Sequence, residues 1–156
     1  MIKLKKILYP TDFSELSLSA VPYVLEFARL FDAEVHCLHV VDEAYQYWMG
    51  AGETAVPMVI PSDDLKKTAE PQLDDFIKQH FGPDSSAVIR VVVAGRPFLE
   101  IIQYARENIM DLIIISTHGR GALASMLLGS VTEKVVRKAP CAVLIVRYPD
   151  HKFEMP

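Results

Sequence analysis

The sequence predicts an α/β fold, a three-layer sandwich built on a five-stranded parallel sheet. Short apolar runs alternate with longer segments whose apolar residues recur at helical spacing, which gives the order β-α-β-α-β-α-β-α-β. The run over residues 112–115 is apolar at every position, as a parallel strand covered by helices on both faces must be. We therefore expect right-handed crossovers, and we take the Rossmann-like strand order 3-2-1-4-5 as the working assumption.

The amino-terminal half opens with a strand over residues 7–10, which ends at Pro10 and a polar turn. The next helix contains Pro22, so we expect it either to begin late, around residues 17–19, or to kink at the proline. The second strand covers residues 35–41 and is apolar on both faces near its end. Residues 42–61 have no clear period, and a loop this long inside a compact domain is usually functional, partner-facing or mobile.

Beyond this loop, Ser62 is expected to cap a helix that bends at Pro71. The apolar face of that helix comprises Leu65, Ala69, Leu73, Phe76 and Ile77. A third strand covers residues 87–93, and Pro97 suits the first turn of the helix that follows it.

The chain then completes the alternation with a fourth strand over residues 112–115, a helix over 130–138 and a fifth strand over 142–146. All these elements fit one domain over residues 1–148. Residues 149–156 form a short tail that we expect to fray.

The composition is that of a globular protein, with 51% hydrophobic and 23% charged residues in a chain of 156. A net charge of -4 argues against a general nucleic-acid binder, which needs a basic surface. No apolar stretch approaches the roughly 20 residues of a membrane span, and the apolar run at the amino terminus is too short for a signal peptide. Cys37 and Cys141 lie in strand-like runs, which is typical of buried thiols in a reducing compartment. We therefore expect a cytoplasmic protein without a nucleic-acid or membrane partner.

Ligands of such sheets bind beyond the carboxyl ends of the strands, where the winding direction reverses. With the assumed strand order, that point lies between the first and fourth strands. Pro10, Thr11 and Asp12 follow the first strand, and Ser116 with Gly119 follows the fourth. The sequence thus predicts a crevice with a carboxylate on one side and a glycine-containing turn on the other.

The turn after the fourth strand is rich in groups that suit phosphate. Glycines allow backbone N–H groups to approach an anion, and His118 and Arg120 offer charge or hydrogen bonds. Ser130 with Glu133 three residues later has the spacing of a capping box, which marks a helix start and its positive dipole end. The alternative is a glycine-rich turn before an ordinary capped helix.

Several segments resemble the universal stress protein family. The stretch from Ser116 through Gly119 to Gly129 and Ser130 resembles its phosphate-binding signature G-x2-G-x9-G-[ST], with serine in place of the first glycine. Residues 9–15, 38–42 and 139–146 resemble its first, second and closing strands. The similarity runs from about Lys5 to Arg147 and implies an adenine nucleotide alpha hydrolase-like fold.

The resemblance also implies roles for individual positions in nucleotide-binding members. Asp12 contacts the adenosine part, Pro10 and Thr11 shape that end of the site, and the backbone of Val40 meets the adenine. The phosphate-holding positions are Gly119, Gly129, Ser130 and Val131. The expected ligand is ATP or another adenine nucleotide, with Mg²⁺ often carried by its phosphates. At the variant signature position, the Cβ of Ser116 excludes some backbone angles that are open to glycine.

We accordingly expect an adenine-nucleotide-binding stress protein with a regulatory role and little or no turnover. The chain has no Walker A motif and no obvious base beside the glycine turn, although slow ATP hydrolysis stays open. Nucleotidyl-transferring and ATP-pyrophosphatase enzymes of related fold carry His-x-Gly-His or Ser-Gly-Gly-x-Asp after the first strand, where this chain has residues 10–14. A nucleotide-free interaction module is the other alternative, and Ser116 favours it. The resemblance implies a homodimer through the fifth strand, from Ala142 to Val146.

Two histidines lie in the second strand. His36 and His39 are three residues apart and therefore face opposite sides of the sheet. They do not form a metal pair, and we expect each to have its hydrogen bonds satisfied within the fold.

Overall fold

The computed structural model describes residues 3–42, 61–117 and 128–147. Its elements are β1 (Lys6–Pro10), α1 (Glu15–Leu18), α2 (Val21–Phe31), β2 (Glu34–Asp42), α4 (Ser62–Phe81), the short 3₁₀ helix η1 (Gly82–Ala87), β3 (Ile89–Gly95), α5 (Pro97–Glu107), β4 (Leu112–Ser116), α6 (Ser130–Lys138) and β5 (Ala142–Val146). The five strands are all parallel, in the order β3-β2-β1-β4-β5. The α/β class and the assumed strand order are thereby confirmed.

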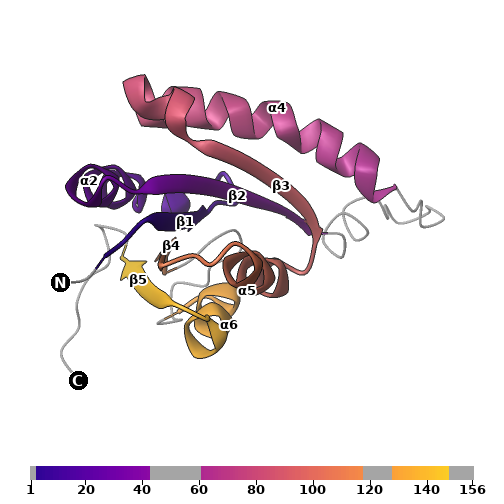
Figure 1. Cartoon of the computed structure of the whole chain (residues 1–156). Helices are drawn as coiled ribbons and strands as arrows, with labels where there is room; N and C mark the ends of the chain where they lie inside the picture. The colour runs from indigo at the N-terminus through magenta and orange to yellow at the C-terminus, as the bar shows by residue number, and fades with distance from the viewer. Residues whose placement is uncertain (1–2, 43–60, 118–127, 148–156) are drawn as a thin grey trace.

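Helices cover both faces of the sheet, with α2 and α4 on one side and α5 and α6 on the other (Figure 1). The side chains of β1 show how the strands serve both layers, because successive residues point to opposite faces. Ile7 and Tyr9 join the apolar cluster beneath α2 and α4, and Leu8 joins the cluster beneath α5 and α6. All three are fully buried. The sheet is therefore covered on both faces, as the continuous apolar run of the fourth strand predicted.

The helix predicted after the first strand is two helices. α1 ends at Leu18, and α2 begins at Val21, later than the expected start around residues 17–19. Pro22 lies in the first turn of α2, where the missing N–H would have had no helical partner. The proline thus marks a new helix start and does not kink a continuous helix.

Two further boundaries differ from the sequence prediction. α4 begins at Ser62, but its N-cap is Pro61 and no side-chain hydrogen bond caps it, so the expected serine cap is wrong. Ser62 already lies inside the first turn because the extended backbone ends at Pro61. β3 begins at Ile89 and not at residue 87, since Gly82, with φ of 56°, ends α4 and leads into η1.

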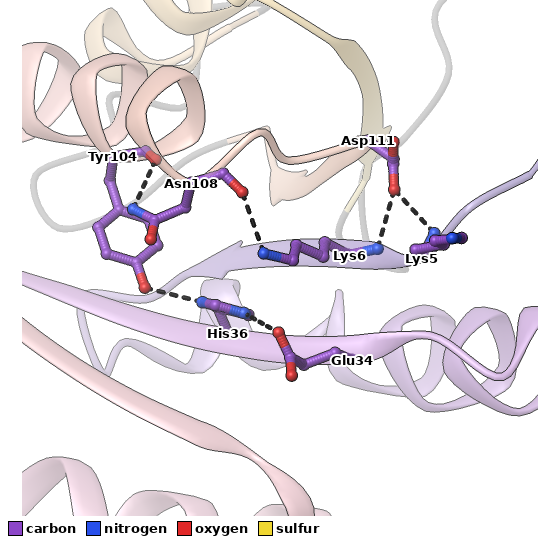
Figure 2. Close-up of polar contacts among 7 residues, drawn as sticks. All are labelled: Lys5, Lys6, Glu34, His36, Tyr104, Asn108 and Asp111. Atoms are coloured by element: carbon purple, nitrogen blue, oxygen red, sulfur yellow. Dashed lines mark hydrogen bonds and ion pairs between the residues drawn. The ribbon is translucent and has the colours of Figure 1, made fainter.

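The amino ends of the strands are held together by polar side chains, which Figure 2 shows. The carboxylate of Asp111 accepts hydrogen bonds from the backbone N–H groups of Lys5 and Lys6, at 2.7 and 3.0 Å. His36 lies between Tyr104, whose hydroxyl is 2.7 Å from Nδ1, and Glu34, whose carboxylate is 2.6 Å from Nε2. Since a carboxylate only accepts, Nε2 carries a hydrogen, and in the neutral ring Nδ1 then accepts from the tyrosine hydroxyl. The expectation that His36 is satisfied within the fold is confirmed.

Within the described ranges, no helix combines the length and the apolar character that crossing a membrane requires.

Candidate functional site

The ladder between β1 and β4 stops before either strand ends. β1 pairs with β2 along its whole length, as far as Pro10 opposite Leu38. Its register with β4 covers two pairs among the described residues, the second of which is Leu8 with Ile113. Both strands continue past these pairs, so the switch point of the sheet lies where their hydrogen bonding has ended.

Pro10 supplies a physical reason for this end. The backbone groups of odd-numbered β1 residues face β2, because Lys5 accepts from Glu34 and Thr11 donates to Leu38. Even-numbered residues therefore face β4. The next donor toward β4 after Leu8 would be residue 10, and proline has no N–H. Pro10, a predicted site residue, therefore leaves β1 without a further N–H donor toward β4.

The turn after β1 is fixed by the hydrogen bonds of Thr11, which is 6% exposed. Its N–H donates to the carbonyl of Leu38 at 2.9 Å, and its hydroxyl lies 3.0 Å from that of Ser17. The Ser17 hydroxyl donates to the carbonyl of Ser14, so the Thr11 hydroxyl is the donor to Ser17. It also accepts from the N–H of Phe13 at 3.1 Å. This buried network holds the backbone on both sides of Asp12.

Asp12 is half-buried at the centre of the turn. Its Oδ1 accepts from the N–H of Ser14 at 3.0 Å and from the hydroxyl of Ser14 at 2.5 Å. Ser14 in turn is the N-cap of α1 and accepts from the N–H of Ser17 through its side chain. The orientation of the Asp12 carboxylate is therefore set by the start of α1.

Phe13 has φ of 64°, in the left-handed region that a side chain of this size rarely adopts. Its ring stacks on the imidazole of His39, with centroids 4.1 Å apart and planes 20° apart. It also meets the ring of Phe76 on α4, at 5.5 Å. His39 additionally approaches the carbonyl of Thr11, with Nδ1 at 2.9 Å. The expected internal partner of this histidine is thereby confirmed.

Val40 lies on β2 beyond the residue that pairs with Pro10. Even-numbered β2 residues direct their backbone groups toward β1, because Glu34 donates to Lys5 and Leu38 accepts from Thr11. The N–H and C=O of Val40 are therefore directed to the side on which β1 has ended. Its side chain packs into the cluster beneath α5 and α6. Only the backbone N–H and C=O of Val40 can therefore contact a ligand in the crevice.

The opposite wall consists of the end of β4 and the start of α6. The N–H of Thr117 donates to the carbonyl of Val146 at 2.9 Å, and the carbonyl of Thr117 accepts from Gly129 at 2.8 Å. The hydroxyl of Thr132 donates to the carbonyl of Ser116 at 2.8 Å. These bonds bring residues 129–132 against the end of β4, so Ser116, Gly129, Ser130 and Val131 lie together there.

The capping box predicted for Ser130 and Glu133 is wrong. Gly129 is the N-cap of α6, with an extended backbone and a carbonyl that accepts from the N–H of Glu133 at 2.9 Å. The helix therefore begins one residue earlier than that motif requires. Gly129 has no side chain with which to cap the helix, and the Ser130 side chain is exposed. A start of this kind directs first-turn N–H groups and the positive dipole end outward, which suits an anion.

Ser116 does not need the conformational freedom of glycine. It is the last residue of β4 and pairs with Val146 on β5. Among the described residues, the non-glycine positions with positive φ are Phe13, Asp32 and Ile109. The backbone angles that Cβ excludes are therefore not used at Ser116, and the departure from the signature causes no strain.

The groups beneath the site are chemically inert at neutral pH. Tyr9 is fully buried and its hydroxyl donates to the carbonyl of Ser17 at 2.9 Å. Burial raises the pKa of Tyr9 and that of the neighbouring Cys37 thiol far above their ordinary values. Neither residue is an acid, base or nucleophile for the crevice.

Three predicted site residues, His118, Gly119 and Arg120, lie outside the described residues, as does most of the loop expected over 42–61. Sequence reasoning missed Thr117 and Thr132, whose hydrogen bonds connect the end of β4 to the start of α6. Thr132 could have been found by placing the N-cap at Gly129, which makes it the third residue of the helix. Thr117 gave no such signal. In the part of the chain that the structure describes, no group of three or more His, Cys, Asp or Glu side chains is arranged to hold a metal ion.

Comparisons with known proteins agree with this architecture. Residues 3–147 match the universal stress protein family. Universal stress protein MJ0531 of Methanocaldococcus jannaschii is 34% identical over 145 residues, which cover 93% of this chain and 83% of that protein. The solved structure of hypothetical protein MJ0577, from the same organism, has a TM-score of 0.74 at 33% identity and covers 96% of this chain and 99% of its own. That of UspA from Lactobacillus plantarum has a TM-score of 0.76 at 26% identity, with 94% and 100% covered. The chain belongs to the universal stress protein family.

Proposed function

We propose that this protein binds ATP or another adenine nucleotide in the crevice between the ends of β1 and β4, and that it acts as a regulatory stress-response protein with little or no turnover. The observation that carries the proposal is the seating of the α6 start on β4. The Thr132 hydroxyl and the Gly129 N–H hold it there, across the switch point from Asp12. An anion-binding helix start and a fixed carboxylate thus flank the place where ligands of such sheets bind.

The two walls suit different parts of a nucleotide. The N–H groups at Ser130 and Val131, with the exposed Ser130 hydroxyl, would hold phosphates. The Asp12 carboxylate would accept from ribose hydroxyls, as acidic residues do in nucleotide-binding sheets. The Val40 backbone presents one donor and one acceptor, which match an adenine edge. His118, Gly119 and Arg120 remain proposed members of the phosphate wall.

Structural neighbours give additional support for the ligand class. One universal stress protein structure is described as a complex with cAMP, and another, from Archaeoglobus fulgidus, as a complex with dAMP. Both are 20% identical to this chain, so they share its fold. They support adenine nucleotides as ligands that this fold accommodates.

Mg²⁺ would accompany the nucleotide and not occupy a site built by protein side chains. Magnesium in nucleotide sites is commonly held by substrate phosphates, one or two carboxylates and water. The described residues offer Asp12 at the crevice and no cluster of metal ligands. This donor set fits an ion brought in by the phosphates.

We further propose a cytoplasmic homodimer paired through β5. This strand is at the edge of the sheet, where its outer backbone groups have no neighbouring strand among the described residues. Its first residue, Ala142, is exposed, and the next three are partly buried. Edges of this kind are commonly covered by a second copy. Sedimentation that shows only monomer at working concentrations would contradict this part of the proposal.

The experiment for the nucleotide site is titration calorimetry with ATP. Asp12→Ala and Gly129→Val should each weaken binding by about tenfold or more, since each removes or blocks a wall of the crevice. Asp75→Ala, which removes an exposed carboxylate on α4, is the matched control and should bind ATP as the unmodified protein does. Failure of the unmodified protein to bind ATP or AMP would favour the nucleotide-free module. Phosphate release well above background would favour an ATPase.

A further inference from the structure

We propose that His39 is a positioning residue of the nucleotide site, which holds the Thr11 carbonyl and thereby keeps the Val40 backbone available to the ligand. This inference rests on the proposed adenine-nucleotide function. His39 contacts the residues on both sides of Asp12, through the carbonyl of Thr11 at 2.9 Å and through the ring of Phe13 at 4.1 Å.

The first step of the argument is the position of His39 along β2. β1 ends at Pro10, opposite Leu38, so His39 is the first β2 residue beyond the end of its neighbour. One further hydrogen bond joins the chain to β2 after Pro10, from the Thr11 N–H to the Leu38 carbonyl. In a parallel ladder that continued, the Thr11 carbonyl would next accept from the Val40 N–H. Here it accepts from the imidazole of His39.

The second step is the direction of that hydrogen bond. A carbonyl only accepts, so Nδ1 of His39 must carry the hydrogen, and this fixes the tautomer of the neutral ring. The imidazole is 9% exposed, so water does not readily replace it as the donor. His39 therefore donates to the Thr11 carbonyl the hydrogen bond that the Val40 N–H would donate if the β1–β2 ladder continued by one more residue.

The third step is the strain at Phe13. A left-handed backbone disfavours a residue with a large side chain, and such a conformation persists where surrounding contacts enforce it. His39 and Phe76 enclose the Phe13 ring from two elements. The same imidazole thus holds the turn by a hydrogen bond before Asp12 and by a ring contact after it.

The first test measures ATP and AMP binding by calorimetry. His39→Phe keeps a ring against Phe13 but removes the donor, and it should weaken both ligands by the same factor, about five- to tenfold. His39→Asn places a side-chain N–H near the position of Nδ1 and should recover part of that loss. The equal factor is diagnostic, because damage to the phosphate wall would weaken ATP more than AMP. His36→Phe is the matched control, since His36 is a buried histidine on the same strand and contacts Tyr104 on the opposite face, and it should change affinity by less than about twofold.

The second test needs no nucleotide. In the ligand-free protein at pH 8, where an ordinary imidazole is neutral, nitrogen chemical shifts should show the Nδ1–H tautomer at His39. Amide exchange at Val40 should become slower in His39→Phe, because the released Thr11 carbonyl takes up that N–H. General loosening of the fold would make it faster.

Folded His39→Phe protein with unchanged ATP affinity would overturn the inference, as would an Nε2–H tautomer or faster exchange at Val40. Absence of ATP and AMP binding to the unmodified protein would instead remove the proposed function, and the tautomer and exchange measurements would still report on the His39 contact.

Discussion

The hydroxyl of Thr132 donates a hydrogen bond to the carbonyl of Ser116, and so ties the third residue of α6 to the last residue of β4. Both residues are buried, with exposed fractions of 3% and 6%. Together with the bond from Gly129 to Thr117, this contact places the helix start at the switch point of the sheet. The position of the α6 start therefore depends on one side-chain hydroxyl and one backbone N–H.

Replacing that hydroxyl by a methyl group should affect both stability and binding. Thr132→Val leaves the buried Ser116 carbonyl without this donor, which should lower the free energy of unfolding by about 1–3 kcal/mol. ATP affinity should fall as well, since the first-turn N–H groups lose their fixed position. Urea unfolding and calorimetry provide the two measurements.

Thr68→Val is the matched control for this change. The Thr68 hydroxyl donates to the Asp64 carbonyl at 3.0 Å, but on the exposed surface of α4. Water can replace that bond, so the unfolding free energy should change by less than about 0.5 kcal/mol. Equal losses of unfolding free energy in the two variants would show that the buried bond stabilises the fold no more than the exposed one.

Restoring the signature glycine should not improve the site. Ser116 has a strand conformation that any residue adopts, so Ser116→Gly gains no backbone freedom that the fold uses. The variant should be less stable by about 0.5–1 kcal/mol, the usual entropic cost of glycine in a strand. ATP affinity, measured by calorimetry, should stay within about twofold of the unmodified protein. A large gain in affinity would mean that the serine side chain obstructs the crevice.

Ile109 offers a stabilising substitution far from the crevice. It has φ of 52° and is 78% exposed. The left-handed backbone is unfavourable for its β-branched side chain, and little burial of apolar surface offsets that cost. Ile109→Asn should raise the free energy of unfolding by about 1 kcal/mol, because asparagine tolerates this conformation. Ile89→Asn, at a strand position with 37% exposure, should be neutral or destabilising in the same urea titration.

The two thiols should differ in their reaction with a water-soluble thiol reagent at pH 8. Burial raises the pKa of Cys37, and no part of its side chain reaches solvent, so it should react only after unfolding. Burial and the nearby Asp111 carboxylate also raise the pKa of Cys141, which is partly exposed. Cys141 should therefore react in the native protein, but more slowly than a free thiol, because less of it is thiolate. Rapid modification of both thiols in the folded state would contradict this reading.

The architecture could be predicted from the sequence because the spacing of apolar residues indicates which faces of a strand or helix are buried. The continuous run at residues 112–115 indicated a strand covered on both faces, and Ile114 is indeed fully buried there. Boundaries were less certain, since Pro22 and Ser62 are compatible with more than one helix start. Gly129 and Ser130 lie near the end of β4 that carries Ser116, whereas the predicted N-cap was wrong by one residue.

The contacts that shape the site could not be read from the chain. His39 and Thr11 are 28 positions apart, and Thr132 and Ser116 are 16 apart, so no local pattern links them. They become neighbours only through the strand order. Phe13 is a further case, because its left-handed backbone depends on rings that come from two other elements.

Pro10 and Asp111 act at opposite ends of the β1–β4 seam. Asp111 fastens the seam where both strands begin, and Pro10 lacks the hydrogen that would fasten it further along. A single pair of strands thus has one end that stabilises the fold through hydrogen bonds and one end whose backbone is left open. Substitutions near the unpaired ends of the two strands should therefore alter the proposed site without loosening the paired amino ends.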